Sequence, residues 1–110
     1  MKQYTTPEQT AKLIELGLEK PKTIVDKYYD FDAEDYIEVN HYSIGELIEM
    51  LPMNINNDGR FESLVIHLNY NSWVVKYSGF FREPTYQSCM KELIDALYNM
   101  ILELKEEGVI

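Results

Sequence analysis

Cysteine and histidine are the residue types in this chain best suited to nucleophilic chemistry. The chain has one cysteine, Cys89, and two histidines, His41 and His67. We expect Cys89 in the first turn of a C-terminal helix, where amide donors and the helix dipole favour a thiolate. Either histidine could then serve as its base. Cysteine, histidine and carboxylate side chains are also the usual ligands of zinc, so the same three residues with a carboxylate are a candidate zinc site. Neither histidine lies in a recognisable motif, so we predict no catalytic residue, no metal site and no cofactor.

A second candidate for chemistry is Asn54–Gly59, which imitates the first half of an EF-hand calcium loop. Such a loop needs several carboxylates and a bidentate glutamate at its twelfth position. Asp58 is the only acid among the first six residues, and the twelfth position is Val65. We therefore predict a plain turn that leads into the following strand.

Acidic residues are densest between positions 30 and 35, where they could attract calcium weakly. No glycine stands at the sharp turn that a calcium loop requires, so we predict a solvated acidic loop. The chain also lacks a glycine-rich phosphate loop and the G-x-S-x-G and H-E-x-x-H motifs. We expect a protein that is not an enzyme.

Three of the nine tyrosines interleave with these acids. Tyrosine is enriched in protein interfaces because it buries a large area and keeps a polar tip. A surface of tyrosines and carboxylates suits a basic protein partner, with charge raising the association rate. The alternative is that tyrosine is simply common in half-buried strands. The candidate partner surface comprises Tyr28, Tyr29, Asp30, Asp32, Glu34, Asp35 and Tyr36.

The length and the net charge of the chain narrow the possible classes of protein further. The 110 residues carry 10 Lys and Arg against 19 Asp and Glu, a net charge of −9. Eight of the acids stand against one lysine within residues 23–49. This negative charge weighs against direct binding of nucleic acid or anionic membranes. No apolar run is long enough to span a bilayer, and residues 1–4 lack the apolar core of a signal peptide. We expect a single cytoplasmic domain over residues 1–110.

Three helices have clear start and stop signals. Thr6 and Gln9 predict a capping box for a helix over 7–16 that ends at Gly17, with its Leu13 and Ile14 facing the core. Ser43 and Glu46 predict a second box, for a helix over 44–51. A third helix is expected from near Thr85 or Ser88 to Gly108. Its apolar stripe lasts about two heptads, so we favour core packing, with self-association through this helix as an alternative. The stripe comprises Met90, Leu93, Leu97, Met100 and Leu104.

Between the helices the hydrophobic period changes to two, which is typical of strands. Pairing Leu68 with Trp73, Ile66 with Val75 and Leu64 with Tyr77 places both apolar sets on one side of a hairpin. A weaker hairpin is predicted upstream, with 30–35 as its connection. The resulting order is α-ββ-α-ββ-α, an α+β fold in which an antiparallel sheet packs against helices.

Three segments, 8–17, 42–52 and 92–98 leading into 104–108, resemble a family of small uncharacterised proteins carried by prophages and mobile elements of gut bacteria. They cover about a third of the chain and coincide with the three predicted helices. The resemblance implies a bacterial cytoplasmic setting and a phage-related role. It implies no activity and identifies no catalytic or binding residue.

Three functions from different classes follow. The first is a non-enzymatic protein-interaction module. The second is an acidic mimic of nucleic acid that binds a DNA-binding host protein. The third is a small-molecule binder, which would need a deep pocket with converging polar groups.

Overall fold

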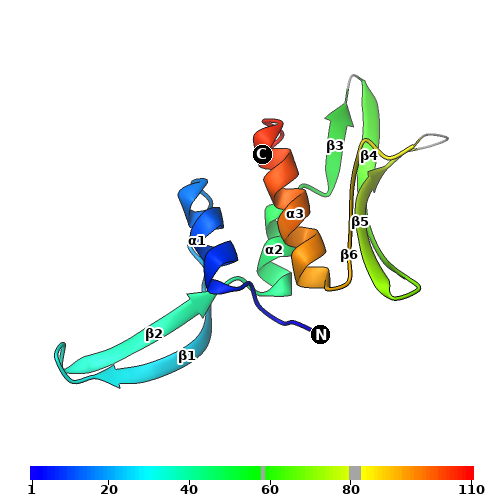
Figure 1. Ribbon diagram of the computed structural model, residues 1–110. Coiled ribbons are helices and arrows are strands. Elements are labelled where there is room, and N and C mark those ends of the chain that lie inside the picture. Colours follow the sequence, from blue (N-terminus) through cyan, green and yellow to red (C-terminus); the bar gives the residue numbers. More distant parts are fainter. Residues whose placement is uncertain (58, 80–82) are drawn as a thin grey trace.

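The computed structural model describes residues 1–57, 59–79 and 83–110 (Figure 1). Antiparallel strands and short helices alternate along these parts of the chain, and the α+β class is confirmed. The helices are α1 (Pro7–Glu15), α2 (Ile44–Met50) and α3 (Leu93–Glu106). The strands are β1 (Thr23–Asp30), β2 (Asp35–His41), β3 (Asn54–Asn57), β4 (Arg60–Asn69), β5 (Ser72–Ser78) and β6 (Tyr86–Met90).

The predicted helix signals are formed in the first two helices. The Thr6 hydroxyl accepts the backbone N–H of Gln9, whose side chain accepts the backbone N–H of Thr6. Ser43 and Glu46 make the same reciprocal pair at the start of α2. Gly17 adopts φ +88°, a left-handed value that favours glycine, at the end of α1. The boundaries of both helices are confirmed to within a residue.

The start of the third helix was predicted wrongly. It begins at Leu93, and the residues from Tyr86 to Met90 form β6, paired with β5. The segment alternates, with Ser88 buried and Gln87 and Cys89 exposed, as a strand at the edge of a sheet does. Met90 extends the helical spacing upstream only by coincidence. Pairing with β5 satisfies the backbone groups of this segment, and local spacing gives no information about such a partner.

The four strands β3-β4-β5-β6 form one antiparallel sheet in that order. The predicted register of the β4–β5 hairpin is confirmed, with Leu64 opposite Tyr77, Ile66 opposite Val75 and Leu68 opposite Trp73. The expected turn at Asn54–Gly59 is instead largely the strand β3, paired with β4. Burial of Ile55 accounts for this difference, because it holds the segment against the core. Asp58 lies outside the described residues.

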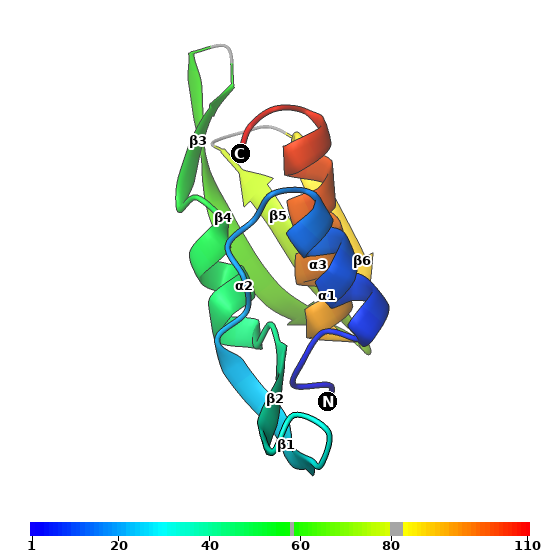
Figure 2. The same ribbon diagram turned by 90° about the vertical axis from the view of Figure 1, so that its left-hand side faces the viewer.

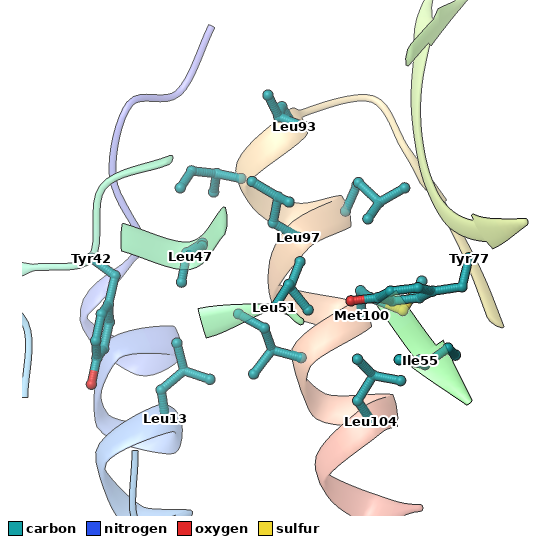
Figure 3. Close-up of a cluster of buried hydrophobic side chains, with 14 residues drawn as sticks. Leu13, Tyr42, Leu47, Leu51, Ile55, Tyr77, Leu93, Leu97, Met100 and Leu104 are labelled. Carbon is teal, nitrogen blue, oxygen red and sulfur yellow. The ribbon is translucent and has the colours of Figure 1, made fainter. Parts of the chain in front are cut away.

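The three helices lie on one side of this sheet (Figures 1 and 2). Met90, the first residue of the predicted stripe, lies on β6 and is 37% exposed, so it does not belong to the core. The rest of the stripe, on α3, is buried between the sheet and α2, so the prediction of core packing is confirmed for it. That stripe is therefore covered by the chain itself. Ile14 is 38% exposed, contrary to the expectation that it faces the core, because α1 buries one narrow stripe through Thr10 and Leu13. Figure 3 shows the centre of the core, which includes Leu13, Tyr42, Leu47, Leu51, Ile55, Tyr77, Leu93, Leu97, Met100 and Leu104.

The upstream hairpin, β1–β2, forms a sheet of its own and projects from the helices on the side away from the larger sheet (Figure 1). We call residues Thr23–His41 the arm. The radius of gyration is 16.2 Å, whereas a compact chain of this length has about 13 Å. The hairpin predicted over this region is therefore present, but it adds length to the molecule and does not join the main sheet.

Candidate functional site

The tip of the arm carries a cluster of exposed aromatic rings. Tyr29 and Tyr36 are direct cross-strand partners, and their ring centroids lie 5.3 Å apart at an interplanar angle of 76°. The ring of Phe31 contacts Tyr29 edge-on at 5.0 Å. Phe31 is 83% exposed and Tyr36 is 61% exposed. We call these three residues the aromatic cluster. The rings stabilise one another by edge-to-face contacts, and Phe31 and Tyr36 keep most of their surface exposed to solvent.

A lysine borders this cluster. The Nζ atom of Lys27 lies 5.0 Å from the centroid of the Tyr36 ring, within the range of a cation–π contact. Lys27 is also opposite Glu38 in the register, on the same face as the cluster. Neither Phe31 nor Lys27 was among the predicted partner-surface residues. Phe31 could have been found as a lone aromatic residue inside an acidic turn.

The seven predicted partner-surface residues do not share one face. Because side chains alternate along a strand, Tyr28 and Asp30 face away from Tyr29. Asp30 and Asp35 are direct cross-strand partners, and like charges in such a pair destabilise a hairpin. The structure thus brings Tyr29 and Tyr36 together on one face, and Tyr28, Asp30 and Asp35 on the other.

The remaining predicted acids, Asp32 and Glu34, lie in the turn at the tip. The Asp30 Oδ1 atom accepts the backbone N–H groups of Asp32, at 2.9 Å, and Ala33, at 3.3 Å. Glu34 has φ +54°, a left-handed conformation that non-glycine residues seldom adopt. One of the acids therefore shapes the turn, while Asp32 and Glu34 are exposed to solvent.

The base of the arm, in contrast to its tip, is held firmly. The Glu46 carboxylate on α2 accepts the backbone N–H of Lys22 at 2.9 Å and the hydroxyl of Thr23. Burial opposes ionisation of Glu46, but hydrogen bonds from Thr23, Lys22 and Ser43 outweigh it and hold its pKa below the usual range. On the β2 side, the buried Tyr42 donates its hydroxyl proton to the Glu19 carbonyl at 2.6 Å.

A chain of hydroxyl groups also reaches the base of the arm. The backbone N–H of Tyr42 donates to Thr5 Oγ1, which lies 2.7 Å from Thr10 Oγ1. Thr10 Oγ1 in turn lies 2.6 Å from His41 Nδ1. If each hydroxyl donates onward, Nδ1 is the acceptor and the neutral ring carries its proton on Nε2. His41 is therefore committed to a structural hydrogen bond at the end of β2.

The cysteine and the histidines are not brought together. Cys89 lies on β6 and is exposed, so its expected place in the first turn of a helix was wrong. His67 and Cys89 flank Val74 on neighbouring strands, and two strand spacings amount to roughly 10 Å, beyond hydrogen-bonding distance. His41 lies on the arm. No group of three or more His, Cys, Asp or Glu side chains in the described parts of the chain is placed to hold a metal ion.

The surface also contains shallow hollows. One of about 410 Å³ lies beside β3 and the end of α3, and among the described residues its lining contains no cysteine, histidine or carboxylate. Burial, together with the charges of Glu107, Glu103 and Glu62, raises the pKa of the Tyr86 phenol there. The lining residues are Pro52, Asn54, Ile55, Asn56, Tyr86, Gly108 and Val109. This set offers no acid–base pair for catalysis.

None of the helices in the described residues is both long and apolar enough to cross a membrane. In comparisons with known proteins, no family model, curated protein or solved structure matches this chain. The resemblance to prophage-borne proteins therefore stays a prediction. The arm, with its aromatic cluster and its acids, is the candidate functional site.

Proposed function

We propose that this chain is a non-enzymatic protein-binding module and that the arm binds a partner with a basic surface. The observation that carries the proposal is the exposed aromatic cluster of Tyr29, Phe31 and Tyr36 at the tip of an acidic hairpin. The folded core does not use these rings. Exposed aromatic anchors of this kind supply much of the binding energy in protein interfaces.

The geometry of the arm supports this role. Its base is held by hydrogen bonds that Glu46 and Tyr42 make to the flanking segments, so the tip is presented in a defined direction. A rigid hairpin loses little conformational entropy on binding. Phe31, the most exposed of the three rings, would enter a pocket on the partner, with Tyr29 and Tyr36 beside it.

Charge determines the kind of partner. Residues 23–49 carry eight acids against one lysine, and most of these acids lie on the arm. A negative arm repels nucleic acid and accelerates encounter with a positively charged protein. The partner should therefore combine an apolar pocket with surrounding lysine or arginine residues.

The two alternative functions have less support. A mimic of nucleic acid needs its acids in one regular stripe, whereas those of the arm lie on both faces and in the turn. A small-molecule binder needs converging polar groups in a deep pocket, and the 410 Å³ hollow is open and offers two asparagines and a tyrosine as its polar side chains.

We further propose that the module acts in a bacterial cytoplasm, in a phage-related setting. The single cysteine supports an environment that does not depend on disulfides. The resemblance of three segments to prophage-borne proteins supports the rest.

Photo-crosslinking tests the proposed function. A benzoylphenylalanine introduced at position 31 should capture a protein from bacterial lysate, and added salt should reduce the yield. Position 70 provides a matched control, because Tyr70 is 94% exposed in the turn of a different hairpin, β4–β5. A basic protein captured at position 31 and not at 70 would support the proposal. Absence of capture at 31, or equal capture at both positions, would refute it.

A further inference from the structure

The outer face of the four-stranded sheet is uncovered. All three helices lie on the opposite side of the sheet, where α3 packs against β5 and β6 (Figures 1 and 2). The strand registers place the side chains of three neighbouring strands on this outer face. Its central residues are Val65, His67, Val74, Lys76, Gln87 and Cys89.

This face differs from the rest of the molecule in charge. The chain carries 19 acidic residues, yet none of the outward-facing positions described on β3, β4, β5 and β6 is Asp or Glu. Lys76 is the one charged residue among them. The arm and the exposed sides of the helices carry carboxylates, so self-association through them would bring like charges together. On this face two copies can approach without that repulsion.

The middle of the face combines apolar side chains with polar ones that carry no negative charge. Val74 is only 5% exposed although it is not part of the main core. Val65 and His67 on β4 are half-buried beside it. Asn54 and Asn56 on β3 form a polar margin. Phe61, opposite Asn56, adds an exposed aromatic ring to this margin. A face that is depleted in charge and carries apolar and aromatic side chains is typical of protein interfaces.

We propose that this outer face is the interface of a homodimer, formed by two sheets packed face to face. Adjacent strands lie roughly 4.8 Å apart and rise roughly 3.4 Å per residue, so each face covers about 450 Å². Two copies would bury about 900 Å², just below the ~1,000 Å² expected of a stable interface. The dimer is therefore weak and depends on concentration. The two arms would lie at opposite ends of it (Figure 1).

Sedimentation velocity of the full chain tests this proposal. The mass should rise from 13.0 kDa towards twice that value as the concentration increases from micromolar to millimolar. Salt should leave the dimer unchanged or strengthen it, because it screens the net repulsion between copies. A chain that stays monomeric over the whole range would overturn the proposal.

Two matched substitutions make the test specific. Val65→Glu places a charge in the centre of the face and should raise the dissociation constant at least tenfold. Ile24→Glu makes the same change in net charge on the arm, where Ile24 is 51% exposed, and should leave it unchanged. Circular dichroism establishes that both variants are folded. Equal weakening by both would overturn the proposal.

Lys76→Gln distinguishes the face-to-face dimer from a second mode of self-association. In that second mode, the acidic arm of one molecule docks on the sheet of the next. Removing the lysine should strengthen a face-to-face dimer or leave it unchanged, since the two lysines no longer repel. An arm-to-sheet contact would weaken, because Lys76 is the cation that the described positions of this face offer to the acidic arm. Such a head-to-tail contact would also form assemblies larger than dimers at low salt. Weakening by Lys76→Gln, or masses above that of a dimer, would overturn the proposal. The inference does not rest on the proposed function of the arm.

Discussion

Glu46 and Lys22 connect the start of α2 to the base of the arm. The Glu46 Oε2 atom accepts the backbone N–H of Lys22 at 2.9 Å, while Oε1 accepts the backbone N–H of Ser43 at 3.2 Å. One carboxylate therefore completes the capping box of a helix and holds the segment that leads into β1. This double use explains how a hairpin that hardly contacts the core can have a fixed direction.

Glu46→Gln should lower the free energy of unfolding by about 1–3 kcal/mol at neutral pH, because the amide replaces an acceptor with a donor that faces N–H groups. Urea unfolding followed by circular dichroism measures this loss. Glu49→Gln is the matched control, since Glu49 is exposed on the same helix, and should change stability by less than about 0.5 kcal/mol. Equal losses in the two variants would show that the hydrogen bonds of Glu46 do not stabilise the fold.

Stability should also depend on the ionisation of Glu46. Its pKa is lower in the folded state than in the unfolded state, so the stabilisation is fully present above its ordinary pKa of about 4.3 and is lost as the pH falls through the folded value. Unfolding free energies measured from pH 7 to pH 3 should therefore fall less steeply in Glu46→Gln than in the wild type. Parallel curves would contradict the assignment.

Glu103 on α3 should behave in the opposite way. Burial raises its pKa, and the charges of Glu107 and Glu106 raise it further. Stability is therefore lost as the pH rises from the ordinary value of about 4.3 through the folded value. Glu103→Gln should stabilise the chain by roughly 0.5 kcal/mol at pH 7, the scale of one like-charge pair on a helix, and by nothing near pH 3. Glu38→Gln, which changes an exposed residue of the arm, is the control. An equal gain in stability of Glu103→Gln at pH 7 and at pH 3 would contradict the explanation.

Tyr77→Phe should destabilise the core. The buried Tyr77 hydroxyl donates to the Pro52 carbonyl at 2.7 Å, and burial raises the pKa of this phenol to about 12. Losing the hydroxyl leaves that carbonyl without its donor, which should cost about 1–2 kcal/mol. Chemical denaturation gives the difference. Tyr70→Phe should have no effect, because Tyr70 is almost fully exposed in the β4–β5 turn, and an equal loss there would contradict the argument.

Phe31→Ala should leave the unfolding free energy within about 0.5 kcal/mol of the wild type, since this ring buries little area in the folded chain. Thermal and urea denaturation test this expectation. A loss above 2 kcal/mol would mean that the ring stabilises the fold, and would remove the reason for assigning it to binding.

The helices and strands that were predicted correctly depend on residues close in the sequence, whereas those that were missed depend on contacts with distant segments. Thr6, Ser43 and Gly17 mark helix ends through bonds to residues a few positions away, so the sequence was sufficient to place them. The β4–β5 register was predictable because this alignment puts Ile66 and Val75 on the same side and leaves a short turn between the strands, whereas a slip of one residue would separate the two apolar sets. The strand β6 was missed, since its partner strand determines its conformation and the spacing of Met90 also fits a helix.

Some features of the candidate site were likewise predictable from the sequence, and others were not. The sequence by itself determined that a hairpin rich in tyrosine and acid exists between α1 and α2, because composition and period-two patterning are local properties. Only the tertiary structure decided that this hairpin stands apart from the main sheet, that Tyr29 and Tyr36 share a face with Phe31 while Tyr28 does not, and that Glu46 fixes its base. Those features depend on strand register and on contacts between distant segments, and both are settled by packing of the whole chain.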